Sequence, residues 1–331
     1  MKKWRFLAGV LFSVAGLIMA VRGVDLRALL AVLTQVQPIW MAVALGLVVL
    51  AMVARAYRWR LLLFPLTELR LVRLFDLLNI GYLINSLLPL RLGDLARAYL
   101  YAELERLELV RVLSTVVVER IVDTLTIVAL LMLVVPHVAL PTDLRHAALG
   151  VGVVAIAASM ILAGIAARGK GVAQWLDQLS ERVTLLKRPG VRREALSALG
   201  GLSALRSWNS VLGALAWSLG AWLCTAVEFY VVMKAMSLAL PFMAALLAVC
   251  LTALGMVVPS SPGQLGVFEY LTVIALSLFG VGQETALAFA LLVHTVGYVA
   301  PVVLGGAGIW REGYSYSQLQ EAVARADRKS T

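Results

Sequence analysis

The sequence predicts an all-α polytopic membrane protein, with about six transmembrane helices and two oppositely oriented re-entrant helical hairpins that resemble an inverted repeat. Of its 331 residues, 61% are hydrophobic and only 15% are charged, and the mean hydropathy is +0.91. A soluble chain of this length has no use for so much apolar sequence. Long apolar runs replace strand-scale alternation, which excludes an outer-membrane barrel. We expect one membrane domain over residues 1–310 and a cytoplasmic tail at 311–331.

Six apolar stretches are long enough to cross a bilayer as helices. They lie at Trp4–Val21, Pro38–Ala54, Val112–Val135, Ala147–Ala166, Trp208–Met233 and Thr285–Leu304. The first is expected to remain as a span, because no signal-peptide cleavage pattern follows it. Between the fourth and fifth, residues 168–206 hold eight Lys and Arg together with apolar residues at helical spacing. This insert is predicted to form an amphipathic helix on the cytoplasmic surface.

Two further segments, at about 74–101 and 242–278, are apolar but interrupted. The first contains Asn85–Tyr101, N-S-L-L-P-L-R-L-G-D-L-A-R-A-Y-L-Y, and the second contains Val257–Glu269, V-V-P-S-S-P-G-Q-L-G-V-F-E. In both, Leu-Gly follows a Pro and a charged residue comes three or four positions later. Ions and irregular backbone are tolerated at membrane depth only where protein or water surrounds them. Each segment is predicted to enter the membrane, break and return, and a cytoplasmic loop is the alternative for the first.

The distribution of basic residues predicts the orientation. If neither hairpin changes side, 22 of the 29 Lys and Arg lie on one side of the membrane and 4 on the other. This bias places both termini in the cytoplasm and the protein in the cytoplasmic (plasma or inner) membrane. The net charge of +10 then reflects topology and contact with anionic lipid, and no nucleic-acid partner is expected. Oppositely oriented broken helices point to a binding site at the midplane of a transporter.

Charged residues in and after the first hairpin are candidates for binding a lipid headgroup. On a helix, Arg91, Asp94 and Arg97 share a face, and an Arg fork at the start of a half-helix suits a phosphate. The alternative is that both Arg residues extend to the interface. The next span carries complementary charge, which either contributes to the site or neutralises itself and anchors the fold. The candidates are Asn85, Arg91, Asp94, Arg97, Glu119, Arg120 and Asp123.

The second hairpin offers mainly neutral groups. Its glycine allows the backbone to approach a ligand closely, and its hydroxyl and N–H groups can donate hydrogen bonds to that ligand. The alternative is that Pro-Gly only makes the turn and the Ser residues cap the next helix. Two carboxylates on this side are candidates for pairing with Arg, binding a cationic headgroup or carrying a proton. The candidates are Ser260, Ser261, Gly263, Gln264, Glu269 and Glu228. We interpret His294, beside Tyr298, as a satisfied buried histidine rather than a relay.

Motifs of catalysis and metal binding are missing from the sequence. It has no H-E-x-x-H, no G-x-S-x-G and no Walker sequence, and its L-G-D lacks the first Gly of the intramembrane aspartyl protease motif. Cys224 and Cys250 lie in apolar runs, as small buried hydrophobes do. We therefore expect neither an enzyme nor a cofactor or metal site. Membrane lipids are the expected partners, and a homo-oligomer is compatible with the sequence.

Four motifs occur in an order that resembles the lysylphosphatidylglycerol synthase transmembrane region family. They are R-x-x-R-W (Arg55–Trp59), N-x-x-x-P-x-R-x-G-D-x-x-R (Asn85–Arg97), E-R-x-x-D (Glu119–Asp123) and P-x-x-P-G-x-x-G-x-x-E (Pro259–Glu269). The resemblance implies a flippase-like membrane domain. In members fused to an aminoacyl-transferase domain, this region is held to move aminoacylated phosphatidylglycerol between leaflets. Stand-alone relatives are linked to export of other lipids, including polyprenyl-linked sugars and hopanoids.

The chain ends 27 residues after its last predicted span, so lipid aminoacylation is not expected of it. The family commonly has Glu where Asp94 stands, a difference in reach at the proposed headgroup site. The expected function is flipping of a phospholipid, aminoacylated lipid or polyprenyl-linked lipid through a central polar cavity. The alternatives are an ion- or proton-coupled transporter of a small anion, an intramembrane lipid-modifying enzyme and a non-transporting scaffold.

Overall fold

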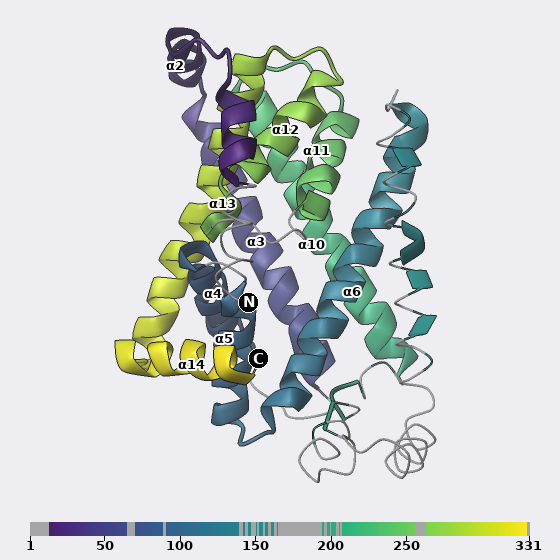
Figure 1. Cartoon of the computed structure of the whole chain (residues 1–331), viewed down its shortest axis with the longest axis vertical. Coiled ribbons are helices and arrows are strands. Elements are labelled where there is room, and N and C mark those ends of the chain that lie inside the picture. The colour runs from purple at the N-terminus through teal and green to yellow at the C-terminus, as the bar shows by residue number, and fades with distance from the viewer. Residues whose placement is uncertain are drawn as a thin grey trace.

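The computed structural model describes residues 13–64, 70–88, 91–138, 207–255 and 262–329, together with scattered positions between 142 and 205. This part of the chain is helical with short connections (Figure 1). The predicted amphipathic insert at 168–206 and the predicted span at Ala147–Ala166 lie largely outside the described residues. So do residues 4–12 of the first predicted span, whose remainder is helical from Ser13 to Val21.

Three helices in the described residues are long and apolar enough to cross a membrane: α3 (Pro38–Leu63), α10 (Trp208–Ala235) and α13 (Gln283–Glu312). The fourth long helix, α6 (Leu109–Val134), has the 26 residues of α3 but carries three ionic residues in its middle. A 26-residue helix is about 39 Å long, which exceeds the roughly 30 Å hydrocarbon core. These four helices occupy four of the predicted spans, and the total of six stays a prediction.

Helix α3 continues nine residues beyond the predicted end of its span at Ala54. The sequence indicated a polar surface segment because Arg55, Arg58 and Arg60 follow the apolar run. In the structure Arg58 is fully buried and meets carboxylates from another helix. The charge is therefore neutralised inside the protein, and the helix does not need to end where the charges begin.

Each interrupted segment forms a pair of short helices that pack against each other. The first pair is α4 (Leu71–Leu87) and α5 (Leu92–Leu104); the second is α11 (Phe242–Gly255) and α12 (Val267–Ser277), with the 3-10 turn η3 (Pro262–Gln264) between them. The longest has 17 residues, about 26 Å, which is shorter than the hydrocarbon core.

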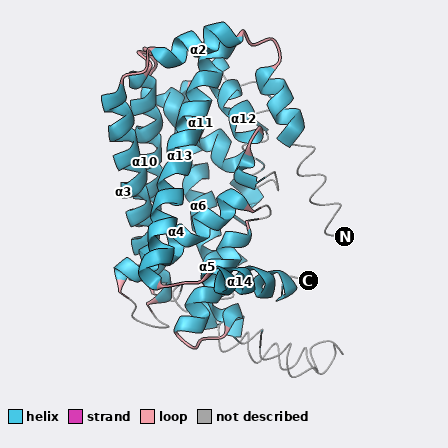
Figure 2. Ribbon diagram, turned by 90° about the vertical axis from the view of Figure 1, so that its left-hand side faces the viewer, coloured by secondary structure: helices cyan, strands magenta, loops and turns pink. Residues whose placement is uncertain are grey.

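The two pairs lie toward opposite ends of the molecule, with α4 and α5 below and α11 and α12 above (Figures 1 and 2). Their turns point toward the middle, where η3 packs against α4. This arrangement has the opposed geometry predicted for the hairpins. Their re-entry from the two membrane surfaces remains a prediction.

Helix α13 contacts both pairs, since it packs against α4 and α12. Close approach to α4 depends on small residues, because a Cβ on Gly305 would lie 2.7 Å from the Asn79 carbonyl oxygen. At the lower end Arg311 pairs with Asp76, which is buried in α4. The long helix thus holds the two hairpins in one body.

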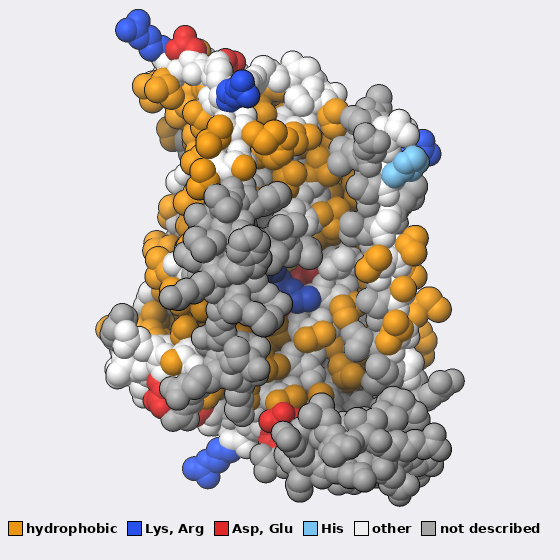
Figure 3. Space-filling model, in the orientation of Figure 1, with side chains coloured by type: hydrophobic (Ala, Val, Ile, Leu, Met, Phe, Trp, Pro, Cys, Tyr) orange, Lys and Arg blue, Asp and Glu red, His pale blue; other side chains and the backbone are white. Residues whose placement is uncertain are grey.

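The remaining elements lie at the ends of the bundle. Helix α2 (Leu26–Thr34) covers the upper end, the 3-10 turn η1 (Val135–His137) ends α6, and α14 (Tyr316–Lys329) lies across the lower end against α5 (Figures 1 and 2). Between the ends, large apolar side chains are exposed on α3, α10 and α13, among them Leu50, Leu212 and Val303. Figure 3 shows this apolar surface on one face of the molecule. Such a large exposed apolar surface is typical of contact with lipid.

Candidate functional site

A cavity of about 540 Å3 lies where the tips of the two helical pairs meet. Its walls come from α3, α4, α6, α10, α11, η3, α12 and α13. Its ionic lining residues are Arg55, Arg91, Arg120, Asp123 and Glu228. Charged side chains are visible at mid-height on the face in Figure 3, within otherwise apolar surroundings. The volume is in the range of sites that bind small molecules, about 300–1,000 Å3.

The first tip is built by a close contact between α4 and α5. The Gly93 N–H donates to the Asn85 side-chain oxygen at 2.8 Å, and a Cβ on Gly93 would lie 1.9 Å from the Gly81 carbonyl oxygen. Arg91 precedes α5 in the left-handed conformation, with φ 54°. It therefore does not share a helical face with Asp94 and Arg97, as the spacing suggested. It lines the cavity and forms no ion pair with any of the described residues.

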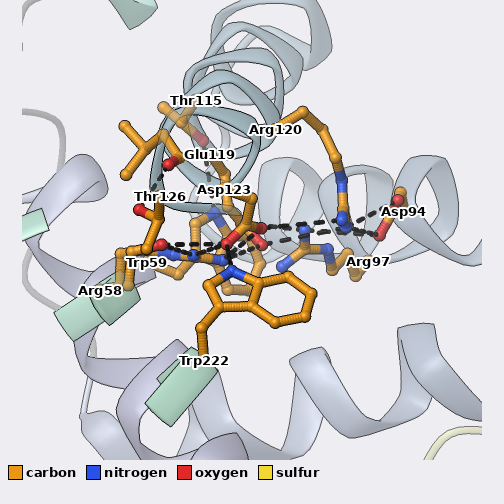
Figure 4. Close-up of polar contacts among 12 residues, drawn as sticks. Arg58, Trp59, Asp94, Arg97, Thr115, Glu119, Arg120, Asp123, Thr126 and Trp222 are labelled. Atoms are coloured by element: carbon orange, nitrogen blue, oxygen red, sulfur yellow. Dashed lines mark hydrogen bonds and ion pairs between the residues drawn. The ribbon is translucent and has the colours of Figure 1, made fainter. Parts of the chain in front are cut away.

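Behind the cavity wall, Arg58 of α3 is the centre of an ionic network (Figure 4). Its guanidinium donates to Glu119 at 2.8 Å and to both carboxylate oxygens of Asp123. Asp123 also accepts from the Ser218 hydroxyl at 3.0 Å and from the Trp222 indole N–H at 2.8 Å. These contacts join α3, α6 and α10 at the depth of the hairpin tips.

Two more Arg residues extend the network to α5. Arg97 donates to the second Glu119 oxygen at 3.0 Å, and its guanidinium lies 4.7 Å from the centre of the Trp59 ring. Arg120 pairs with Asp94 at 3.0 Å. The network therefore holds three Arg and three carboxylates, and its formal charge is zero. Buried ions of this kind are tolerated because each has a partner.

The predicted site residues divide into three groups. Seven line the cavity: Asn85, Arg91, Arg120, Asp123, Glu228, Gly263 and Gln264. Four are packed outside its lining: Asp94, Arg97 and Glu119 in ion pairs, and Glu269 in contact with His294. Ser260 and Ser261 lie outside the described residues.

The second tip requires glycine at position 263. Its φ is +68°, and a Cβ there would lie 1.2 Å from the Tyr298 hydroxyl oxygen. Behind this turn, the Glu269 carboxylate accepts from the Gly266 N–H at 2.6 Å and contacts His294 through its other oxygen. The second ring nitrogen of His294 lies 3.0 Å from the Gly263 carbonyl oxygen. His294 is largely buried, as the sequence suggested, but it also lines the cavity and connects α13 to the tip.

Two further residues of the cavity lining, Arg55 and Trp222, were not among the site residues that the sequence predicted. Arg55 lines the cavity, with its guanidinium 5.4 Å from the centre of the Trp222 ring and 3.5 Å from the Thr225 hydroxyl. The helical periodicity of α3 could have indicated Arg55, because residues three, four and seven positions apart lie on one face of a helix. Val48, Ala51 and Met52 share that face with Arg55, and all four line the cavity. Nothing local in the sequence singled out Trp222.

Long apolar helices, two opposed pairs of short helices and an ionic central cavity define a polytopic helical membrane protein with an internal polar chamber. The chain belongs to the family described by the lysylphosphatidylglycerol synthase TM region, whose model matches residues 6–305. A relative in Methanothermobacter thermautotrophicus (strain Delta H), called a UPF0104 membrane protein, is 24% identical over 260 residues. That match covers 74% of this chain and 77% of the relative.

Proposed function

We propose that the protein is a lipid flippase, in which a phospholipid headgroup passes through the central cavity between the leaflets of the cytoplasmic membrane. One observation carries the proposal: Arg91 lies in the cavity without an ion-pair partner among the described residues. The network behind it is neutral, so it does not cancel this charge. Arg55 is a second cation on the wall, and no carboxylate of the described part of the chain is in ion-pair contact with it. Such a cavity favours an anionic group, and a guanidinium fork matches phosphate.

The physical advantage of the cavity is that only the headgroup has to leave water. A charged group in hydrocarbon costs at least ~2.5–3.5 kcal/mol on insertion scales. In the cavity, Arg55, Arg91 and the polar side chains of Asn85 and Gln264 replace its hydration. The acyl chains stay in the bilayer, against the apolar exterior of the bundle. We propose transport without bond chemistry, with membrane lipids as the partners and both termini in the cytoplasm.

The proposal is tested by flipping in proteoliposomes with acyl-labelled phosphatidylglycerol and phosphatidylcholine, read by reductive quenching of the outer leaflet. Arg91→Gln removes the free charge, and Arg60→Gln is the matched control because Arg60 is an exposed residue at the end of α3. A charge-assisted hydrogen bond is worth about 1.5–3 kcal/mol. We therefore expect Arg91→Gln to slow flipping of phosphatidylglycerol by roughly 10-fold to 100-fold, and Arg60→Gln to match the parent.

Equal rates in Arg91→Gln and Arg60→Gln would remove Arg91 from the site. Uptake of free inorganic phosphate by liposomes that do not flip lipid would instead indicate a transporter of small anions. Chemical conversion of the labelled lipid during the assay would indicate a lipid-modifying enzyme.

A further inference from the structure

The contact between His294 and the tip of the second helical pair has two oxygen acceptors and one imidazole. One ring nitrogen meets the Glu269 carboxylate, and the other lies 3.0 Å from the Gly263 carbonyl oxygen. A neutral imidazole has one N–H donor and one lone pair. It satisfies both contacts only if the carboxyl group itself carries a proton. The arrangement therefore holds one proton more than a neutral imidazole beside an ionised carboxylate.

Both contacts are satisfied wherever this proton lies within the pair. With an imidazolium, both ring N–H groups donate, one to Glu269 and one to Gly263. With a carboxylic acid, Glu269 donates to His294 and the remaining ring N–H donates to Gly263. Because the two side chains are in direct contact, the pair acts as a single proton-binding site.

Loss of the proton breaks one of the two contacts. The side chain of Glu269 is only 1% exposed, and a buried carboxylate without a compensating partner is strongly disfavoured. The remaining ring N–H is then needed by Glu269, which leaves the Gly263 carbonyl without its donor. Gly263 lies in the turn that lines the cavity, so deprotonation removes this hydrogen bond between the tip and α13.

In the described part of the chain, the groups that face the pair come from α12, α13, the first helix and the cavity wall. From α13, Tyr298 packs against the ring of His294 with ring centres 4.8 Å apart, and its buried hydroxyl has no hydrogen-bond partner among the described residues. From α12, the ring of Phe268 lies 4.5 Å from that of His294, and the first helix presents backbone of Ser13 to Gly266. The charged residues across the cavity are Arg55, Arg91, Arg120, Asp123 and Glu228. His294 lines the cavity, which provides a route for the proton.

We propose that the His294–Glu269 pair is the proton-binding site that couples lipid transport to the proton gradient, by holding the Gly263 turn when protonated and releasing it when deprotonated. This inference rests on the proposed flippase function and names its coupling ion. A proton binds to the pair from one side of the membrane and leaves to the other side, and no other reactant is needed.

The first test is flipping in proteoliposomes under an imposed pH difference. The variant is His294→Gln, whose amide has N–H donors and an oxygen acceptor but no ring nitrogen that can bind a proton. The matched control is His137→Gln, at an exposed position in η1. We expect the parent and His137→Gln to change their flipping rate several-fold with the pH difference, and His294→Gln to flip at a rate independent of it. Equal dependence in all three proteins would overturn the proposal.

A second test does not depend on lipid transport. The chain has three His, so a His137→Gln/His146→Gln background leaves His294 as the only imidazole for nitrogen NMR. In the same background, Cys224 and Cys250 are replaced by Ala. Leu265, which follows η3 directly and is 55% exposed, is replaced by Cys to report the accessibility of the Gly263 turn. Because the thiolate is the reacting form, labelling at 265 is compared at each pH with that of a small free thiol. We expect labelling relative to this reference to rise as His294 loses its proton, and to stay constant when His294→Gln is added.

Together the two tests separate the proposals. A parent protein that does not flip lipid, but whose labelling at position 265 follows the titration of His294, contradicts the flippase and supports the proton site. If the labelling at position 265 does not change as His294 loses its proton, the proton site is contradicted, whatever the flipping rate.

Discussion

Replacement of Arg58 by Met is expected to destabilise the protein by about 3–5 kcal/mol, the usual cost of removing one partner from a buried ion pair. Arg58 is fully buried and contacts both Glu119 and Asp123. Methionine fills much of the space but leaves the two carboxylates short of one cation. The measurement is equilibrium unfolding in mixed micelles, followed by tryptophan fluorescence.

The control for this prediction is Arg60→Met, two residues further along the same helix at an exposed position, where little change is expected. The double variant Arg58→Met/Asp123→Asn restores the charge balance and should lose less stability than the sum of the single variants. If Arg58→Met has the same free energy of unfolding as the parent, the network does not anchor the fold as its contacts indicate.

Replacement of Gly93 by Ala is expected to force α4 and α5 apart at the first tip. The new Cβ would lie 1.9 Å from the Gly81 carbonyl oxygen and 2.8 Å from the Asn85 side-chain oxygen. A backbone oxygen cannot rotate away, so the helices must separate, at a cost of roughly 1–3 kcal/mol or more. Because Arg91 lies two residues before Gly93, the same shift moves its guanidinium. Stability in the unfolding assay and lipid flipping should therefore both fall.

Gly46→Ala is the matched substitution for Gly93→Ala. Gly46 lies inside α3 with no atom near a built Cβ, and alanine is preferred to glycine in a helix by about 1 kcal/mol. We expect Gly46→Ala to retain or increase stability and to flip lipid like the parent. If both glycine variants behave alike, the tight crossing at the first tip is not what positions Arg91.

The ionic network changes which Arg residue is informative about ligand binding. The sequence suggested that Arg91 and Arg97 form a fork for phosphate. In the structure Arg97 is already bonded to Glu119 and lies near Asp94, and it does not line the cavity. An Arg97 variant therefore tests the integrity of the fold, whereas an Arg91 variant tests the site.

Much of the fold was predictable because membrane helices have strong local signals. The apolar runs predicted α3, α10 and α13, and the interruptions at Asn85–Tyr101 and Val257–Glu269 predicted where the short helices turn. The predicted end of α3 at Ala54 was nine residues too early, because charged residues without a known partner indicate the protein surface. The partners of Arg58 come from α6, about 60 positions later in the chain, and a local pattern cannot show them.

The sequence by itself determined the membrane class, the helical pairs and four of the five ionic residues that line the cavity, because hydropathy, Pro and Gly act locally on the backbone. Only the tertiary structure decided which charges cancel and which stay free: Arg58 and Arg97 are committed to carboxylates, and Arg91 faces the cavity. It likewise decided that His294 bridges Glu269 and Gly263. The physical reason is that charge pairing depends on distances between helices, which are set by how their surfaces pack and not by spacing along the chain.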